Sequence, residues 1–365
     1  MERPGGGSIR RPGSSAASGA AKRADPFSEY TDANKLGITL DIESEEGRRL
    51  FLRLVAKADV VVESFPPGHL ATIGCSYEVM SGANPGLVLA SVTGFGQTGP
   101  RSGYRSCDLV ACAFGGQMYV TGEPAASPLR AYGEQSSCVA SLFAAVGVLL
   151  ALIKRRKTGK GEHIDISSQE AVAGTLDHVL VRYLYDGIVP RRQGSLAWNR
   201  SSFILPCRDG HIHVSIAQQW ETLVEWVAAE GMAEDLREER WNDEVYRSRH
   251  VDHVMDVLRR WTLGHDVEEL VETAQAMRFP WAAVARPADV ASSPQLIARE
   301  FFRAAGPAGP GGGPAMPGMP YRFDGSSSGP ARRAPLPGED NQRVYRDHLG
   351  LSEEEVARLA RSGII

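Results

Sequence analysis

An apolar helix that follows a polar loop and ends in a basic turn is the feature that most constrains this chain. Residues 140–153 are apolar on almost every side, so we expect a buried helix rather than one with a polar face. The run is short for a membrane span, and the cations at 154–157 suit a helix C-terminus. A Thr-Gly-Lys-Gly turn follows, and residues 163–167 alternate like a strand. The stretch therefore predicts a loop, a buried helix, a turn and a strand.

The start of this helix is the first place to look for chemistry. Ser136 or Ser137 could cap the helix by accepting hydrogen bonds from the backbone N–H groups of its first turn. The N-terminus of a buried helix also presents the positive end of its dipole to any anion that lies there. We therefore take the residues around Ser137 as the candidate site.

Alternating strand and helix patterns upstream indicate a parallel sheet. Residues 34–42, 59–64 and 87–93 are typical of strands, with an amphipathic helix over 44–58 and a short helix over 77–82. Residues 59–64 are apolar enough for a strand buried on both faces. This order predicts a doubly wound, Rossmann-like α/β domain with right-handed crossovers.

The pattern changes in the second half of the chain. A helix is expected over 169–185, and Arg208-Asp209-Gly210 joins two short strands as a hairpin turn does. We predict that residues 1–195 form the first part of the large domain and that 196–300 form a smaller α+β domain. Residues 301–365 would then be a linker and a C-terminal return to the large domain.

Composition argues against several classes of protein. A net charge of −4 without a basic stripe gives no reason to expect nucleic acid. Five cysteines without C-x-x-C spacing argue against a zinc site and a disulfide framework, and suit a reducing cytoplasm. The start of the chain has no apolar leader, so we expect a cytoplasmic protein outside the membrane. Segments 1–24 and 305–335, rich in small residues and proline, are typical of flexible loops.

A glycine loop, Gly94-Phe95-Gly96-Gln97-Thr98-Gly99-Pro100, precedes Asp108, Gly115-Gly116 and the apolar helix. In this order and spacing the motifs resemble those of class III CoA-transferases, the family of formyl-CoA transferase, carnitine CoA-transferase and methylacyl-CoA racemase. The resemblance covers nearly the whole chain and implies a large domain built from both chain ends, in an interlocked dimer. Residues 1–5 resemble the end of the family's first strand, so an opening strand and helix would lie upstream or come from a partner.

The resemblance implies covalent catalysis by a carboxylate. The family's aspartate attacks an acyl-CoA thioester to give a mixed anhydride, then an enzyme–CoA thioester. The aspartate's position falls on Ser137, which cannot form that anhydride and has no histidine nearby in the sequence to activate it. Glu134 could act if the loop shifted, and Cys138 lies where a helix dipole lowers a thiol pKa. The simpler interpretations are that Ser137 is a helix cap, Glu134 a solvated charge and Cys138 a small buried side chain.

The resemblance also implies contacts to coenzyme A, which would be a substrate and not a tightly bound cofactor. The implied contacts are Arg3, Ser64, Phe65, Gly94, Gly96, Arg105 and Asp108. Cations that the family carries are replaced here by Glu43, Pro66 and Thr72. Fewer cations weaken phosphate binding, unless these are tolerated surface changes. A racemase is disfavoured because Cys107 and Ser137 stand where it needs a histidine and an aspartate.

Three functions follow from these residues. The first is a CoA-transferase subunit that is itself non-catalytic and pairs with an aspartate-bearing homologue, similar to the silent subunits of arylsuccinate CoA-transferases. The second is a self-sufficient enzyme, in an interlocked homodimer, with Glu134 as the displaced nucleophile. The third is an acyl-CoA-binding protein without turnover. The sequence identifies neither the acyl donor nor the acceptor acid.

Overall fold

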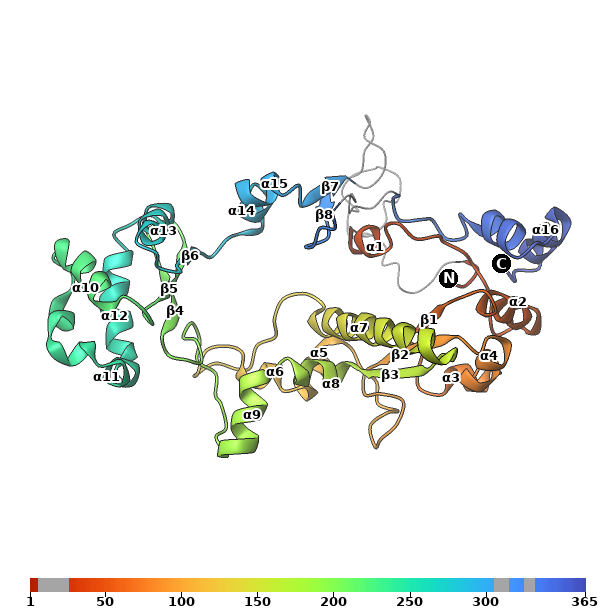
Figure 1. Cartoon of the computed structure of the whole chain (residues 1–365), viewed down its shortest axis with the longest axis horizontal. Helices are drawn as coiled ribbons and strands as arrows, with labels where there is room; N and C mark the ends of the chain where they lie inside the picture. The colour runs from red at the N-terminus through yellow and green to blue at the C-terminus, as the bar shows by residue number, and fades with distance from the viewer. Residues whose placement is uncertain (6–25, 305–314, 325–331) are drawn as a thin grey trace. The chain divides into compact units, whose positions relative to one another are not determined.

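The computed structural model describes residues 1–5, 26–304, 315–324 and 332–365 (Figure 1). The chain divides into two compact units. Unit 1 comprises residues 1–106, 137–168 and 290–365, and unit 2 comprises residues 107–136 and 169–289. The segments expected to be flexible, 1–24 and 305–335, lie largely outside the described residues. The predicted domain boundaries stay a prediction.

A three-stranded parallel sheet forms the framework of unit 1. Strands β1 (Val60–Glu63), β2 (Val88–Thr93) and β3 (His163–Ser167) pair in the order β1-β2-β3. The α/β class with a parallel sheet is thereby confirmed. The central strand β2 is almost continuously buried, as expected for a strand covered on both faces. The prediction of a fully buried strand over 59–64 is wrong, because β1 pairs only with β2 in the described structure and its Val62 is 66% exposed.

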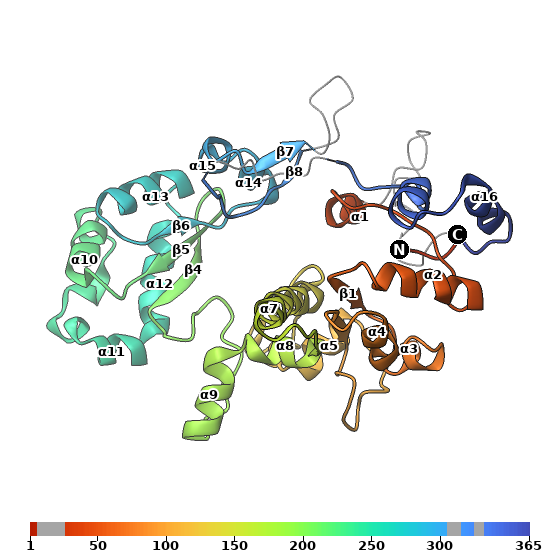
Figure 2. The same ribbon diagram turned by 45° about the vertical axis from the view of Figure 1, so that its right-hand side comes forward.

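Helices pack beside the β1 edge of this sheet (Figures 1 and 2). The elements are α2 (Glu45–Val55), α3 (His69–Thr72) and α4 (Tyr77–Ala83). Ser44 caps α2 by accepting from the Gly47 N–H at 3.1 Å, and α2 buries Leu50, Phe51 and Val55. The strand predicted over 34–42 is reduced to a single bridge between Glu2 and Thr39.

The two chain ends meet within unit 1. The C-terminal elements are the π-helical segment η3 (Gln342–His348) and α16 (Glu353–Arg361), which a capping box begins. The buried Tyr345 hydroxyl donates to the Thr39 carbonyl at 2.7 Å, and the Asp41 N–H donates to the Ile364 carbonyl at 2.8 Å. The remaining short elements are α1 (Pro26–Thr31), α14 (Pro287–Ala291), α15 (Pro294–Ala298), β7 (Phe302–Ala304) and β8 (Ala315–Pro317).

Helix α7 (Gln135–Thr158) runs along the sheet and packs on it through small residues (Figure 1). Ala140, Ala144 and Ala151 are buried, and a Cβ at Gly147 would lie 3.4 Å from Ile164 of β3. In the last turn, Arg155 donates to the Gly86 carbonyl at 2.9 Å and pairs with Asp59 at 2.8 Å. These contacts fix the helix against β2 and β3.

The opposite face of α7 is apolar and exposed, so the prediction of a helix buried all round is wrong for this chain alone. Its exposed fractions run from 49 to 68% for Leu142, Phe143, Val146, Leu149, Leu150 and Ile153. Among the described residues, α7 is also the one helix long and apolar enough to cross a membrane. The core helix of a protein outside the membrane can have the same length and composition, and α7 packs on the sheet as a core helix does. An exposed face of this kind is typical of an association surface.

Unit 2 contains the predicted hairpin and a hydrophobic core of its own. Strands β4 (Ser202–Pro206) and β5 (His211–Ser215) pair antiparallel, and β6 (Ala282–Ala283) adds to β5, which confirms the hairpin. The helices around it are α10 (Trp220–Ala229), η1 (Glu234–Arg237), η2 (Glu239–Asn242), α11 (Glu244–Arg249), α12 (Val251–Thr262) and α13 (Val267–Ala276). Phe203, Trp261 and Trp281 are fully buried between them.

The helix predicted over 169–185 is broken in two. It divides into α8 (Ser168–Gly174) and α9 (Asp177–Asp186), with Thr175 and Leu176 between them. No residue of α9 is buried, and Leu184 and Tyr185 are 75% and 85% exposed. Helix α9 is therefore a second exposed apolar surface.

Asp340 joins the C-terminal segment to the N-terminal one, and its pKa predicts a pH-dependent stability. The buried carboxylate accepts from the Gly37 N–H at 2.8 Å and pairs with Arg332 at 2.8 Å. Burial alone would raise the pKa of Asp340, but the hydrogen bonds and the charge of Arg332 outweigh it and lower the pKa. Such a group stabilises the fold above its unfolded pKa and stops doing so as the pH falls through the folded value.

We expect Asp340→Asn to lower the free energy of unfolding by about 2 kcal/mol near neutral pH. The loss should shrink as the pH falls below about 4. Urea titrations across this pH range measure both effects. The control is Asp347→Asn, which removes an exposed pair with Arg346 and should cost less than about 0.5 kcal/mol. An equal loss at every pH would contradict the charge argument.

Candidate functional site

The predicted site residues are divided between the two units. Unit 1 contains Arg3, Ser64, Phe65, Gly94, Gly96, Arg105, Ser137 and Cys138. Unit 2 contains Cys107, Asp108 and Glu134. Helix α7 begins between Glu134 and Ser137, so the start of this helix is the natural point from which to describe the site.

The carboxylate of Asp108 caps α7. The helix begins at Gln135, so the prediction that Ser136 or Ser137 is the cap is wrong, and both lie inside the first turn. Asp108 Oδ1 accepts from the Ser136 N–H at 2.8 Å and from the Ser136 hydroxyl at 2.9 Å. Both residues are buried. The anion at this helix N-terminus is therefore the chain's own carboxylate, in the position that the helix dipole favours.

Asp108 is held by the residues around it. It is the first residue of α5 (Asp108–Phe114), and Arg130 Nη1 lies 3.4 Å from its Oδ2. Arg130 also donates to the Gly133 carbonyl at 3.2 Å, which connects Asp108 to the loop before α7. Burial, and then the charge of Asp108, raise the pKa of the Cys112 thiol. Cys112 is therefore an inert thiol and not a nucleophile.

The segment between α5 and this loop is held by an arginine that the sequence did not suggest. It begins with α6 (Gln117–Val120). Arg192 donates to the carbonyls of Tyr119, Glu123 and Ala126 at 3.1, 3.2 and 3.0 Å. No local pattern marks Arg192, because its three acceptors are distant in sequence and belong to the backbone.

The three candidate nucleophiles differ in their exposure. Ser137 and Cys138 are exposed, and Glu134 is half-buried directly before the first helical residue. Within the described residues, none of these side chains makes a hydrogen bond or ion pair, so no histidine is hydrogen-bonded to the Ser137 hydroxyl. Ser137 is therefore accessible to a ligand and lacks a base in this chain.

In unit 1 the structure brings Arg3 and Phe65 to one corner. Arg3 pairs with Glu43, whose carboxylate lies 3.9 Å from His69 Nε2. The His69 ring in turn lies 4.9 Å from the Phe65 ring, next to the exposed Ser64. The charge of Arg3 is thus engaged by Glu43, at a position where the resemblance implies a lysine. Sequence reasoning missed His69.

A depression of about 170 Å³ adjoins this corner. Its ionisable lining side chains are Glu63, His69, Tyr77, Glu78 and His163, and no lysine or arginine lines it. The buried Nε2 of Gln97, which also lines it, has no hydrogen-bond partner among the described residues. Phosphate groups need cations, so this depression offers a nucleotide little electrostatic attraction.

The predicted glycines have structural reasons for being glycine. Gly96 has a φ of +85°, and a Cβ there would lie 3.4 Å from Asp165, which accepts from the Gln97 N–H at 2.9 Å. A Cβ at Gly94 would overlap Ser106. Arg105 is exposed and makes no ion pair within the described residues. Contacts of these residues with coenzyme A stay predictions, and no group of side chains in the described structure could hold a metal ion.

Comparison with known proteins gives consistent matches. A family model described as CoA-transferase family III matches residues 1–341. The chain is 32% identical to succinyl-CoA:(R)-benzylsuccinate CoA-transferase subunit BbsE of Thauera aromatica, over 100% of this chain and 90% of that protein. It is 29% identical to the succinyl-CoA–L-malate CoA-transferase beta subunit of Chloroflexus aurantiacus, with the same coverage. A CAIB/BAIF family protein from Brucella suis superposes with a TM-score of 0.84 and 28% identity, over 95% of this chain and 90% of that one.

The Asp108 cap predicts different effects for two adjacent serines. Ser136→Ala removes a buried hydrogen bond and should lower the free energy of unfolding by about 1 kcal/mol. Ser137→Ala removes an exposed hydroxyl and should change it by less than about 0.5 kcal/mol. Denaturant titration of both variants measures the difference. Equal destabilisation would contradict the assignment of Asp108 as the cap.

Proposed function

The chain belongs to CoA-transferase family III, and on that premise we propose that it is the non-nucleophilic subunit of a heteromeric CoA-transferase. The complex would move coenzyme A from an acyl-CoA such as succinyl-CoA to a carboxylic acid, in the cytoplasm. A homologous partner subunit would supply the nucleophilic aspartate. The observation that carries the proposal is Ser137, an exposed hydroxyl without a base at the position that the family resemblance gives to the nucleophile.

The chemistry explains why a serine there would be silent. In the family reaction, a carboxylate attacks the thioester carbonyl and expels the CoA thiolate, which leaves an acyl carboxyl anhydride. The thiolate then attacks the enzyme's carbonyl and expels the first acid, because a carboxylate is a good leaving group. Serine has no side-chain carbonyl, so on an ester of Ser137 the thiolate could attack only the substrate's own acyl carbonyl. That attack expels the Ser137 alkoxide and reforms the starting acyl-CoA, so no enzyme–CoA thioester can form. The anhydride route is therefore closed to Ser137.

The Arg3 corner supports the same conclusion. Arg3 is the cation that the resemblance assigns to coenzyme A, and Glu43 already neutralises it. The neighbouring depression is lined by Glu63 and Glu78 and by no lysine or arginine. Both features weaken attraction for the phosphates of coenzyme A. If the partner subunit binds coenzyme A, this subunit does not need cations at these positions, and their loss has no cost for the complex.

Two exposed apolar surfaces support a partner. One is the outer face of α7, and the other is α9, of which no residue is buried. Large exposed apolar faces mark association surfaces, and a homologous subunit would cover them. The names of BbsE and of the L-malate beta subunit describe subunits, which fits a heteromer. An interlocked arrangement is part of this proposal.

The second candidate function is a self-sufficient transferase with Glu134 as its nucleophile. One observation favours it: Glu134 is a half-buried carboxylate directly before the first residue of α7. The backbone N–H groups there stabilise negative charge, including charge that develops during acyl transfer. Substitution of this one residue separates the two candidates.

We expect the chain to transfer no coenzyme A alone and to do so with its aspartate-bearing homologue from the same genome. The measurement is mass-resolved size exclusion, with a transfer assay from succinyl-CoA to a panel of carboxylic acids. Glu134→Gln should leave the activity of the pair unchanged, while replacement of the homologue's aspartate by asparagine should abolish it. Transfer by the chain alone that Glu134→Gln removes would establish the second candidate instead.

Helix α9 gives a test of the partner surface. Leu184→Lys places a charge on a residue that contacts no core, so the chain's own unfolding should be almost unchanged. Association with the partner should weaken by at least about tenfold, because an apolar contact is replaced by a desolvated charge. The control is Asp186→Asn on the same helix, which should leave association unaltered. Analytical ultracentrifugation measures both, and full association of Leu184→Lys would rule out α9 as the contact.

A further inference from the structure

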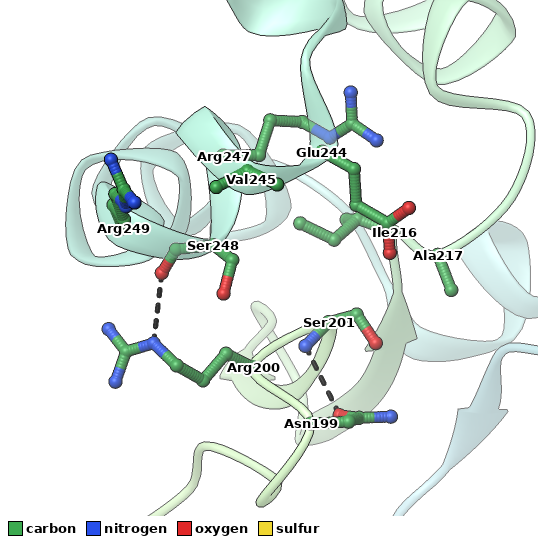
Figure 3. A pocket seen from close by; sticks show the side chains of 10 residues that line it. All are labelled: Asn199, Arg200, Ser201, Ile216, Ala217, Glu244, Val245, Arg247, Ser248 and Arg249. Atoms are coloured by element: carbon green, nitrogen blue, oxygen red, sulfur yellow. Dashed lines mark hydrogen bonds between the residues drawn. The ribbon is translucent and has the colours of Figure 1, made fainter.

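A cavity of about 340 Å³ opens in unit 2 between the loop at 199–201, the end of β5 and helix α11 (Figure 3). Its volume is that of a site for a small molecule. Its polar lining includes three arginines, two serine hydroxyls and one carboxylate: Arg200, Arg247, Arg249, Ser201, Ser248 and Glu244. Ile216 and Val245 add apolar surface.

The three arginines lack ion-pair partners among the described residues. In the same part of the chain, Arg208, Arg240, Arg259, Arg260 and Arg286 all pair with carboxylates. Between residues 199 and 289, only Arg237 and Arg278 share this lack of a partner, and neither lines the cavity. The cations without counterions are therefore concentrated at one place.

Arg247 is the most buried of the three, with 7% of its surface exposed. Its Nη1 donates to the carbonyls of Trp241 and Asn242 at 2.7 and 2.9 Å, and its guanidinium lies 4.9 Å from the Trp220 ring. Burial lowers its pKa, which the charges of Glu244 and Asp243 partly offset. The buried Trp220 indole N–H has no acceptor in the described structure. Donors thus outnumber acceptors beside this wall, and an anion nearby would be stabilised.

Arg200 holds the loop side of the cavity in an uncommon backbone conformation. Its φ is +57°, which residues other than glycine rarely adopt, and its Nε donates to the Ser248 carbonyl at 2.9 Å. The hydrogen bond joins the loop to α11. Strained residues of this kind persist where the surroundings fix them and are common at ligand sites. Figure 3 shows the side chains of Arg200 and Arg249 on one side of the opening and Glu244 on the other.

We propose that this cavity binds a short hydroxy acid. The carboxylate of the ligand would lie on the side of Arg200 and Arg249, within reach of charge-assisted hydrogen bonds. The hydroxyl would donate to the carboxylate of Glu244, and Ser201 and Ser248 would complete the polar contacts. The carbon chain would pack on Ile216 and Val245. The proposal rests on unit 2 alone and does not depend on the transferase chemistry.

Isothermal titration calorimetry of the full chain tests this with sodium malate, sodium succinate and inorganic phosphate as probes. Malate should bind saturably, and succinate, which lacks the hydroxyl, at least about tenfold more weakly. Arg249→Gln and Arg200→Asn should each weaken malate binding by about tenfold or more. Asparagine tolerates the left-handed backbone at 200, so that variant removes the guanidinium without adding backbone strain. The control is Arg237→Gln, an unpaired arginine outside the cavity, which should bind malate normally.

Glu244→Gln gives a result that a merely structural role would not produce. Removing its negative charge lessens the repulsion of both dicarboxylates, but malate also loses the charged acceptor of its hydroxyl. Succinate binding should therefore strengthen several-fold relative to malate binding, and the preference for malate should narrow. Absence of saturable malate binding at millimolar concentration would overturn the proposal. Malate binding that survives both arginine variants unchanged, or binding of phosphate alone, would overturn it as well.

Discussion

The carboxylate of Asp108 determines where helix α7 begins, and the geometry of the candidate site depends on that one contact. A helix that starts without its own capping side chain leaves N–H donors unsatisfied. Asp108 satisfies the Ser136 donors from another helix, and Arg130 balances its charge. Asp108 therefore occupies the buried side of the first turn of α7. Ser137 and Cys138 lie on the exposed side of that turn, and Glu134 lies directly before it.

Helix α7 has two different faces, one of small buried residues and one of large exposed residues. Its small residues allow a close approach to the sheet, so Ala140, Ala144 and Gly147 serve the fold of this chain. Its large residues, such as Leu142 and Leu150, contribute little to that fold and remain exposed. A sequence that is apolar all round therefore combines an internal packing face with an exposed apolar face. The two faces together account for the composition of the helix, and neither does so alone.

The sequence predicted the positions of helices and strands better than it predicted their burial and their contacts. Alternation and glycine placement located β2, β3 and the β4–β5 hairpin, because these patterns reflect local backbone geometry. The exposure of Val62 and of one face of α7 was mispredicted, since hydrophobicity alone does not reveal what covers a surface. The Asp108 cap and the Arg192 contacts were missed because their partners are backbone groups or residues distant in sequence. The sequence showed that Glu43 replaces a cation of the family, but it did not show that Glu43 pairs with Arg3.

The contacts between the chain ends have a consequence for how the protein is made. Asp340 bonds to Gly37 and Tyr345 to Thr39 across about 300 residues of intervening chain. During synthesis, residues 26–106 emerge early but lack the C-terminal side chains that complete their core. The hairpin and helices of residues 199–289 find their partners within one continuous segment and can fold while translation continues. The core of unit 1 therefore cannot be completed until the last residues of the chain are synthesised, and its apolar surface stays exposed to solvent until then.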